Sequence, residues 1–276
     1  MWKSKILWVC FIFFPATLLA FEGIGSIGGR SAAMGNASVA LTDFWAIQNN
    51  PAGIALQQNI TAGFAYQSRF MMKELSLKSV AVSAPMNFGV LGLSFNQFGY
   101  SLYNENKLGI AYARAFGANY RLGIQLDYLY HYIADDYEHF KGVTFELGAQ
   151  ADITDNFSIG AYVFNLPHLK RSKLTNEMIP IILRFGFLYK FTPSLIGLAE
   201  FGKGLDFEPD LRFGAEYEVT SYFVVRSGIG VNPGIVTFGT GLLLNAFSFD
   251  IAAELHPVLG ASLQAGLIYT FPKKSN

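Results

Sequence analysis

Charged residues, cysteine and long apolar runs are all scarce in this chain of 276 residues. Only 14% of the residues are charged, and 20 basic residues balance 20 acidic ones, so no basic excess is available for binding nucleic acid. A single cysteine excludes a disulfide framework. After the N-terminus no run reaches about 18 apolar residues, which excludes a bundle of membrane helices. Because 51% of the residues are apolar, disorder is excluded as well.

Aromatic residues and glycine are abundant instead. The chain has 26 Phe, 14 Tyr and 28 Gly, a composition that indicates a β-rich protein. Over most of its length apolar and polar residues alternate with a period of two. Between Tyr120 and Tyr132, one set carries Leu, Ile and Tyr side chains and the other carries Arg121, Gln125 and Asp127. Only an extended strand places two such sets on opposite faces.

The N-terminus has the features of a secretory signal peptide. A short basic region precedes an apolar core at residues 6–19, and Ala20 is a small residue suited to cleavage. We therefore expect residues 1–20 to be removed, and Cys10 with them. An uncleaved membrane anchor and a lipoprotein anchor at Cys10 are the alternatives.

The alternating runs predict fourteen strands separated in turn by short turns and longer links. The predicted strands are residues 59–69, 77–86, 87–97, 106–116, 119–133, 141–154, 156–166, 180–191, 194–202, 209–219, 222–231, 234–245, 247–256 and 260–271. An even strand number with short turns at one end and longer loops at the other is typical of outer-membrane barrels. We therefore predict an all-β fold, a transmembrane antiparallel β-barrel of the bacterial outer membrane with both termini in the periplasm.

A soluble β-sandwich is the alternative, because it also alternates apolar and polar residues. Two features argue against it. The polar set is rich in glycine, which suits a crowded interior, and the apolar set carries large residues almost without interruption. A soluble monomer exposing so large an apolar surface would aggregate, whereas lipid accepts that surface.

Residues 21–58 have no strand pattern and contain two distinctive runs, GGRSAAMGNASVAL at 28–41 and NNPAGIA at 49–55. These runs resemble the N-terminal region of the superfamily of FadL and PorV/PorQ outer-membrane barrels. The resemblance implies fourteen strands and an N-terminal segment that folds into the lumen as a plug. The residues that carry it are Gly29, Arg30, Ala33, Met34, Gly35, Asn50, Pro51, Ala52 and Gly53.

The implied organisation is a plug at residues 21–58, a barrel at 59–271 and a periplasmic tail at 272–276. A plug is also reasonable on physical grounds, because side chains of the wall alone do not fill a barrel of this strand number. No catalytic role follows from either the plug or the barrel.

Two functions follow from the resemblance. The first is a non-enzymatic accessory subunit of a secretion complex, like the PorV-type proteins of the Bacteroidota type IX machinery. This interpretation is favoured because the links between the predicted strands are shorter than those of FadL-type transporters. The partner would then be a larger outer-membrane protein. The alternative is a FadL-like channel for hydrophobic small molecules. Apolar residues on inner faces favour that channel, namely Leu129, Phe164, Leu188, Leu243 and Ile268.

Charges of both signs lie on the predicted lumen side of the strands. Buried charges need partners, so we expect an ion-pair network that braces wall and plug, with a polar pathway for solutes as the alternative. The predicted network contains Arg121, Asp127, Glu146, Asp152, Arg184, Arg212, Glu216, Arg226, Asp250 and Glu254.

Motifs for cofactors, metals and catalysis are weak. The pattern G-x-G-x-x-G at residues 23–28 follows no strand and opens no βαβ unit, so it does not predict a nucleotide site. The four histidines have no metal-ligand spacing. His131 and Asp127 share a lumen face, but no nucleophile accompanies them. We expect no cofactor, no metal and no catalytic residue.

Two basic features concern the membrane. Residues 168–173 form a basic loop that would face outward, either simply solvated or in contact with lipopolysaccharide phosphates. Arg114 shares its parity with Leu108 and Ile110 and is therefore directed at lipid. Either a β-bulge turns Arg114 inward, or its guanidinium reaches the periplasmic interface.

Overall fold

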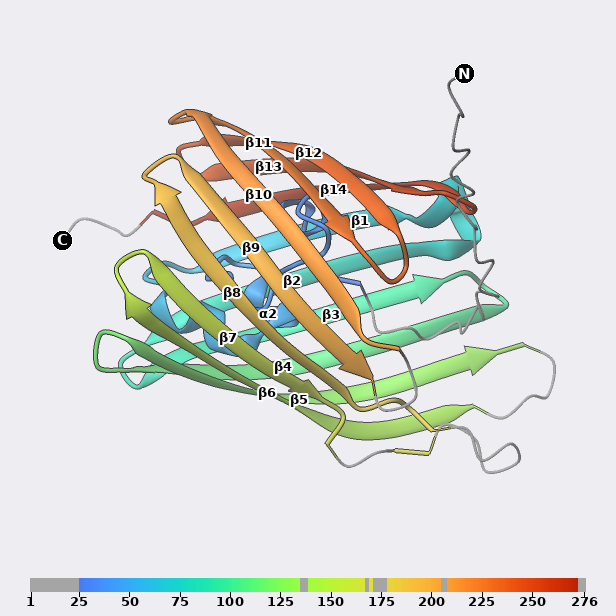
Figure 1. The fold of residues 1–276 in the computed structure, drawn as a ribbon. Coiled ribbons are helices and arrows are strands. Elements are labelled where there is room, and N and C mark those ends of the chain that lie inside the picture. Colours follow the sequence, from blue (N-terminus) through green and yellow to red (C-terminus); the bar gives the residue numbers. More distant parts are fainter. Residues whose placement is uncertain (1–24, 135–138, 167–168, 171–177, 205–207, 273–276) are drawn as a thin grey trace, which may run out of the picture.

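A closed barrel of antiparallel strands dominates the computed structural model, which describes residues 25–134, 139–166, 169–170, 178–204 and 208–272. Each strand pairs with its neighbours along the chain, and β1 pairs with β14 to close the ring (Figure 1). The predicted signal peptide, residues 21–24 and most of the tail lie outside the described residues. None of the described helices is long and apolar enough to cross a membrane.

All fourteen predicted strands are confirmed, and none of their ends differs from the prediction by more than three residues. The strands are β1 (Thr61–Ser68), β2 (Ser76–Met86), β3 (Gly89–Gly99), β4 (Tyr103–Phe116), β5 (Tyr120–Ile133), β6 (Phe140–Thr154), β7 (Phe157–Phe164), β8 (Ile182–Thr192), β9 (Leu195–Gly204), β10 (Asp210–Thr220), β11 (Phe223–Gly230), β12 (Ile235–Leu244), β13 (Phe247–His256) and β14 (Gly260–Thr270).

The two ends of the barrel differ in their connections. Two- or three-residue turns join β2 to β3, β4 to β5 and each later pair at one end, which we call the short-turn end. The opposite, long-link end carries the connection from β7 to β8 and the short helices η2 (Arg69–Met71) and η3 (Lys73–Leu75). The predicted link 98–105 shrinks to residues 100–102, because β3 and β4 extend their ladder beyond the alternating pattern.

The outer face of the wall carries the large apolar residues, as the alternation predicts. On β5, Leu122 and Ile124 are 52% and 43% exposed, whereas Arg121 and Gln125 on the other parity are buried. Glu200 is buried and its neighbour Phe201 is exposed, which places the outer face of β9 on the parity of Phe201. The wall therefore presents apolar side chains outward and polar ones inward.

Arg114 lies on the outer face. The ladder between β4 and β5 runs without a register shift, so no bulge turns this residue inward. Its guanidinium lies over the ring of Phe116, 5.7 Å from the ring centroid, and β4 ends two residues after Arg114. The side chain therefore reaches toward the rim at the short-turn end.

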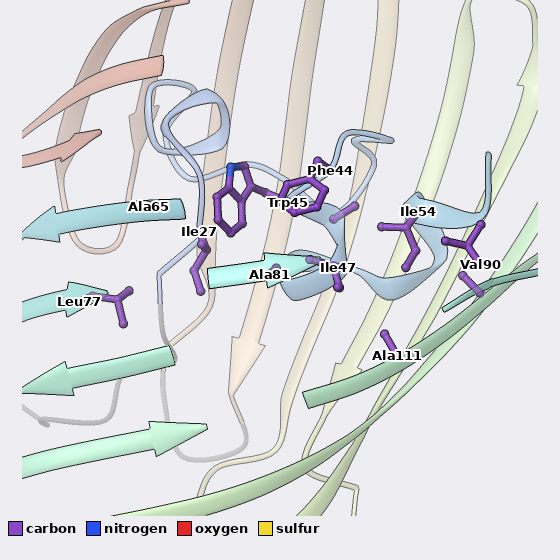
Figure 2. Packing of buried hydrophobic residues seen from close by; sticks show 12 residues of the cluster. Ile27, Phe44, Trp45, Ile47, Ile54, Ala65, Leu77, Ala81, Val90 and Ala111 are labelled. Carbon is purple, nitrogen blue, oxygen red and sulfur yellow. The ribbon is translucent and has the colours of Figure 1, made fainter. Parts of the chain in front are cut away.

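Residues 25–58, here called the inner segment, lie inside the barrel (Figure 1). They form α1 (Gly29–Ala32), α2 (Ala46–Asn49) and the 3-10 helix η1 (Pro51–Leu56). Figure 2 shows Trp45, Phe44 and Ile47 projecting from this segment into a cluster of buried residues. Its partners on the wall are Ala65, Leu77, Ala81, Val90, Ala111 and Ala113.

Glycine on the inner face of the wall makes room for this segment. A Cβ at Gly148 would lie 2.0 Å from Asn50 Oδ1, and one at Gly228 would lie 2.1 Å from the backbone nitrogen of Gly35. A side chain at either site would collide with the inner segment. The glycine-rich polar parity therefore reflects close approach of two backbones.

This packing predicts that Gly228→Ala loosens the inner segment but leaves the barrel closed. A new methyl group would overlap backbone atoms of Met34 and Gly35, and overpacking of this kind costs about 1–3 kcal/mol. Limited proteolysis of the folded barrel should cut the inner segment faster in this variant. Gly266→Ala is the matched control, because its nearest neighbour would be 3.7 Å away. Equal cleavage of both variants would contradict the prediction.

Candidate functional site

The run NNPAGIA fastens the inner segment to itself and to the wall. Asn50 is fully buried, and its Nδ2 donates to the carbonyl of Val39 at 2.7 Å and to that of Ala161 on β7 at 3.3 Å. Its Oδ1 accepts from the backbone nitrogen of Ala52 at 3.2 Å, which caps η1 beginning at Pro51. One asparagine thus bonds backbone groups of η1, of β7 and of the chain around Val39.

The first run, GGRSAAMGNASVAL, has a comparable role on the opposite wall. Gly35 has φ of 68°, and its nitrogen donates to Thr237 Oγ1 at 2.8 Å. The same hydroxyl donates to the carbonyl of Ala33 at 2.8 Å. A Cβ at Gly35 would lie 2.6 Å from the carbonyl oxygen of Ile229, so glycine fits this turn both in conformation and in space. Met34 packs in a separate apolar cluster with Leu188 and Leu198.

An ion-pair cluster, here called the latch, joins the inner segment to β10, β11 and β13. Arg30 on α1 makes a bidentate contact with Glu216, with Nε to Oε2 at 2.8 Å and Nη2 to Oε1 at 2.7 Å. Glu216 also accepts from Arg226 Nε at 2.6 Å, and Arg226 pairs with Asp250. Asp43 lies on the other side of Arg30, with Oδ2 at 3.5 Å from Nη1.

Neighbouring carboxylates keep Arg30 of the latch ionised. Burial lowers the pKa of Arg30, but Glu216 and Asp43 raise it more, so the net shift is upward. Burial raises the pKa of Asp43, and the Arg30 guanidinium offsets part of that rise. Arg30 therefore remains a cation and holds Glu216 by charge-assisted hydrogen bonds.

Three more predicted network residues contact the inner segment directly. Arg184 donates to Ser38 Oγ at 3.1 Å and Arg212 donates to the carbonyl of Asn36 at 3.2 Å. Glu254 Oε2 accepts from Asn36 Nδ2 at 2.7 Å. Together with the latch, these contacts tie one side of the inner segment to charges on β8, β10, β11 and β13.

Four predicted network residues pair along the wall instead. Arg121 makes a bidentate contact with Asp152, at 2.6 and 2.8 Å. Glu146 accepts from Lys107 at 2.6 Å, and Asp127 accepts from Gln125 at 2.8 Å. The first contact joins β5 to β6, the second joins β4 to β6 across β5, and the third lies within β5. None of these contacts reaches the inner segment.

Glu200 is a bracing residue that the sequence analysis left out of the network. Its Oε2 accepts from the backbone nitrogens of Ser38 and Val39 at 2.7 and 2.8 Å. It also lies 3.5 Å from Arg184 and 3.7 Å from Arg212. Strand β9 is weakly amphipathic, so only its place between two arginine-bearing strands signals this role.

A cavity of about 260 Å³ lies between the latch and the short-turn end. All five latch residues line it, and so do apolar side chains from the wall and the inner segment. The apolar lining residues are Trp45, Ile196, Val224, Leu243 and Ile268. Trp45 Nε1 is buried and has no hydrogen-bond partner among the described residues, so one donor at this cavity is unused. We call this space the short-turn cavity.

A second apolar region lies toward the opposite end. Leu129, Phe164 and Ile179 are buried together, in contact with Val39 of the inner segment. Phe140, Leu169 and Ile182 pack against them at the ends of β6, the β7–β8 link and β8. We call these residues the long-link cluster. The inner segment therefore lies between the buried long-link cluster near one end of the lumen and the short-turn cavity near the other.

Nothing in the described part of the chain points to a metal or nucleotide site. No group of three or more His, Cys, Asp or Glu residues there is placed to hold a metal ion. His131 packs against Phe140, with ring centroids 5.2 Å apart. Gly28 has φ of 104° and lies against Trp45, where a Cβ would be 2.4 Å from Cδ1. Residues 23–24 and most of the basic loop 168–173 lie outside the described residues.

Known structures share this architecture. The toluene transporter TodX of Pseudomonas putida superposes with a TM-score of 0.67 and 12% identity, over 90% of this chain and 98% of that one. The CymD monoaromatic hydrocarbon channel gives 0.69 and 12%, over 91% and 99%. A FadL homologue of Pseudomonas aeruginosa gives 0.60 and 12%, over 88% and 95%. At these identities the likeness shows the fold, which is that of FadL-type outer-membrane barrels.

Comparison of sequences identifies no family for this chain. No protein-family model matches the chain, and no curated protein matches it. The structural matches do not support the PorV/PorQ branch that the N-terminal runs resemble.

The latch yields a prediction for Arg30→Gln. This change removes two charge-assisted hydrogen bonds to Glu216, each worth about 1.5–3 kcal/mol, from the contact between inner segment and wall. We expect backbone amides of α1 to exchange with solvent deuterium about tenfold faster or more, since 1.4 kcal/mol is a factor of ten. Hydrogen-exchange mass spectrometry of the folded barrel measures this.

Asp152→Asn is the matched control, because it breaks an ion pair that joins wall to wall only. Its inner segment should exchange as in the parent protein. Faster exchange of α1 in the control, or unchanged exchange in Arg30→Gln, would show that the latch does not hold the segment.

Proposed function

We propose that this protein is an outer-membrane channel that admits small hydrophobic molecules. In this proposal the short-turn end faces the periplasm and the long-link end faces outward, as is usual for such barrels. The inner segment closes the lumen, and a solute passes when that segment shifts. The location in the outer membrane follows from the wall, whose outward side chains are apolar.

Apolar surface on both sides of the inner segment carries this proposal. The long-link cluster offers an entry site of Leu, Phe and Ile side chains, and the short-turn cavity offers an exit site that is apolar on one side. Ligand sites commonly combine an apolar lining with a few polar groups that fix orientation. A sealed and uniformly polar lumen would have opposed a channel of this kind.

The latch is the gate in this proposal. Its charges lie on the inner segment and on three wall strands, and they border the short-turn cavity directly. Separating Arg30 from Glu216 would widen the cavity toward the inner segment without breaking any strand ladder. Arg30 keeps 26% of its side chain exposed, so water in the cavity can solvate its guanidinium when the pair with Glu216 separates.

Aromatic hydrocarbons are the first probes to use. TodX is described as a toluene transporter and CymD as a monoaromatic hydrocarbon channel. The Phe and Leu side chains of the long-link cluster are apolar groups that such a molecule would contact. We therefore extend the proposal to small aromatic hydrocarbons.

Leu129→Asn tests the channel. Leu129 is 1% exposed at the centre of the long-link cluster, and an amide there would place polar atoms where an apolar solute should bind. The assay uses cells that bear lipopolysaccharide and lack a toluene channel of their own. We expect these cells to take up radiolabelled toluene several-fold more slowly when they carry this variant than when they carry the parent protein. Leu129→Met keeps volume and apolarity and should restore uptake.

Toluene uptake no faster than in cells without the protein would refute the channel. Purification from gently solubilised membranes then decides for the accessory role: a larger outer-membrane protein in equal amount would favour it. The secretion partner and contact with lipopolysaccharide remain predictions from the sequence.

A further inference from the structure

The outer wall has a shallow groove over β4, β5, β6 and β7 near the short-turn end. It encloses about 470 Å³, within the range of about 300–1,000 Å³ of ligand pockets, and almost all of its lining is apolar. The groove exists because two alanines are neighbours across the β6–β7 ladder, Ala149 and Ala161. On the adjacent row the outward residues are the larger Ile124, Leu147 and Val163.

One cation stands at the end of this groove. The cross-strand row that contains the two alanines continues through Leu122 to Arg114, which also lines the groove. Among the described residues the Arg114 guanidinium contacts the ring of Phe116 and forms no ion pair with a carboxylate. A charged group on a lipid-facing wall is costly unless an ion of opposite sign or water meets it.

Charge on the outward parity is otherwise confined to the long-link end. In the described strands the charged outward residues are Lys78, Arg114, Lys141 and Lys203. Three of these lie within three residues of the long-link end of their strands, and only Arg114 lies near the short-turn end. No acidic residue shares this parity in the described strands, so a fixed anion from the membrane is the natural partner.

We propose that this groove binds one glycerophospholipid of the leaflet at the short-turn end. The phosphate pairs with Arg114, whose guanidinium presents planar donors suited to phosphate oxygens. One acyl chain lies along Ala149 and Ala161, where small side chains let it approach the wall closely. This site lies on the outer face and is independent of the channel proposed for the lumen.

Native mass spectrometry tests the site on the full barrel purified from outer membranes in mild detergent. We expect one glycerophospholipid to remain bound to the parent protein after the bulk detergent and lipid are removed. In Arg114→Gln the lipid-bound fraction should fall at least threefold. Lys141→Gln is the matched control, because it removes an outward cation that lies over a ring, Tyr130, at the opposite end.

Ala161→Leu tests the groove without touching the arginine. The larger side chain would occupy the space of the acyl chain, so the lipid-bound fraction should fall as in Arg114→Gln. Ala215→Leu adds the same side chain to the outward parity of β10, away from the groove, and should retain the lipid. The shift in gel mobility on heating verifies that each variant is a folded barrel.

Equal retention of lipid by the parent, Arg114→Gln and Ala161→Leu would overturn the proposal. Retention of lipopolysaccharide in place of a glycerophospholipid would overturn it too, because that lipid belongs to the other leaflet. Loss of lipid from both control variants as well would show nonspecific association. None of these results depends on toluene uptake, so the site and the channel can fail separately.

Discussion

Filling the lumen is the constraint on which the rest of the structure depends. Fourteen strands enclose a space that wall side chains alone do not fill, and irregular backbone placed there must find partners for its polar groups. The wall provides them through Thr237, Glu200 and Gln150, each of which bonds backbone atoms of the inner segment. Glycines on the wall let the two backbones approach closely enough for these bonds.

The same constraint explains the division of charge in the barrel. Charges that face the inner segment are paired with it or with one another, whereas the outward parity of the described strands has only scattered cations near the rims. An unpaired charge is costly in a dry interior and in lipid, but much less so at an interface with water or phosphate. The positions of Arg30 and Arg114 follow from this one rule, although the two residues face opposite solvents.

The barrel could be predicted well from the sequence because its signal is local. Period-two alternation reports which face each residue occupies, and lipid outside makes that alternation strong, so every strand was found. Contacts of the inner segment were harder to predict. The partner of Arg30 is 186 residues away, and nothing in the alternation of β10 distinguishes Glu216, which holds the segment, from Asp152 on β6, which pairs only along the wall. Such pairings depend on how the segment lies in the lumen.

Function is less visible in the sequence than fold, because the two proposed sites use common residues in particular places. The long-link cluster consists of Leu, Phe and Ile residues that would be unremarked on any strand, and they matter because they line a lumen beside a segment held by ion pairs. The lumen of a channel must be closed weakly enough to open, whereas the lumen of a scaffold does not have to open. If no solute passed through the lumen, well-packed apolar residues could close it more firmly than ion pairs do. The latch therefore fits the proposed passage through the barrel better than the support of a partner on its outer wall.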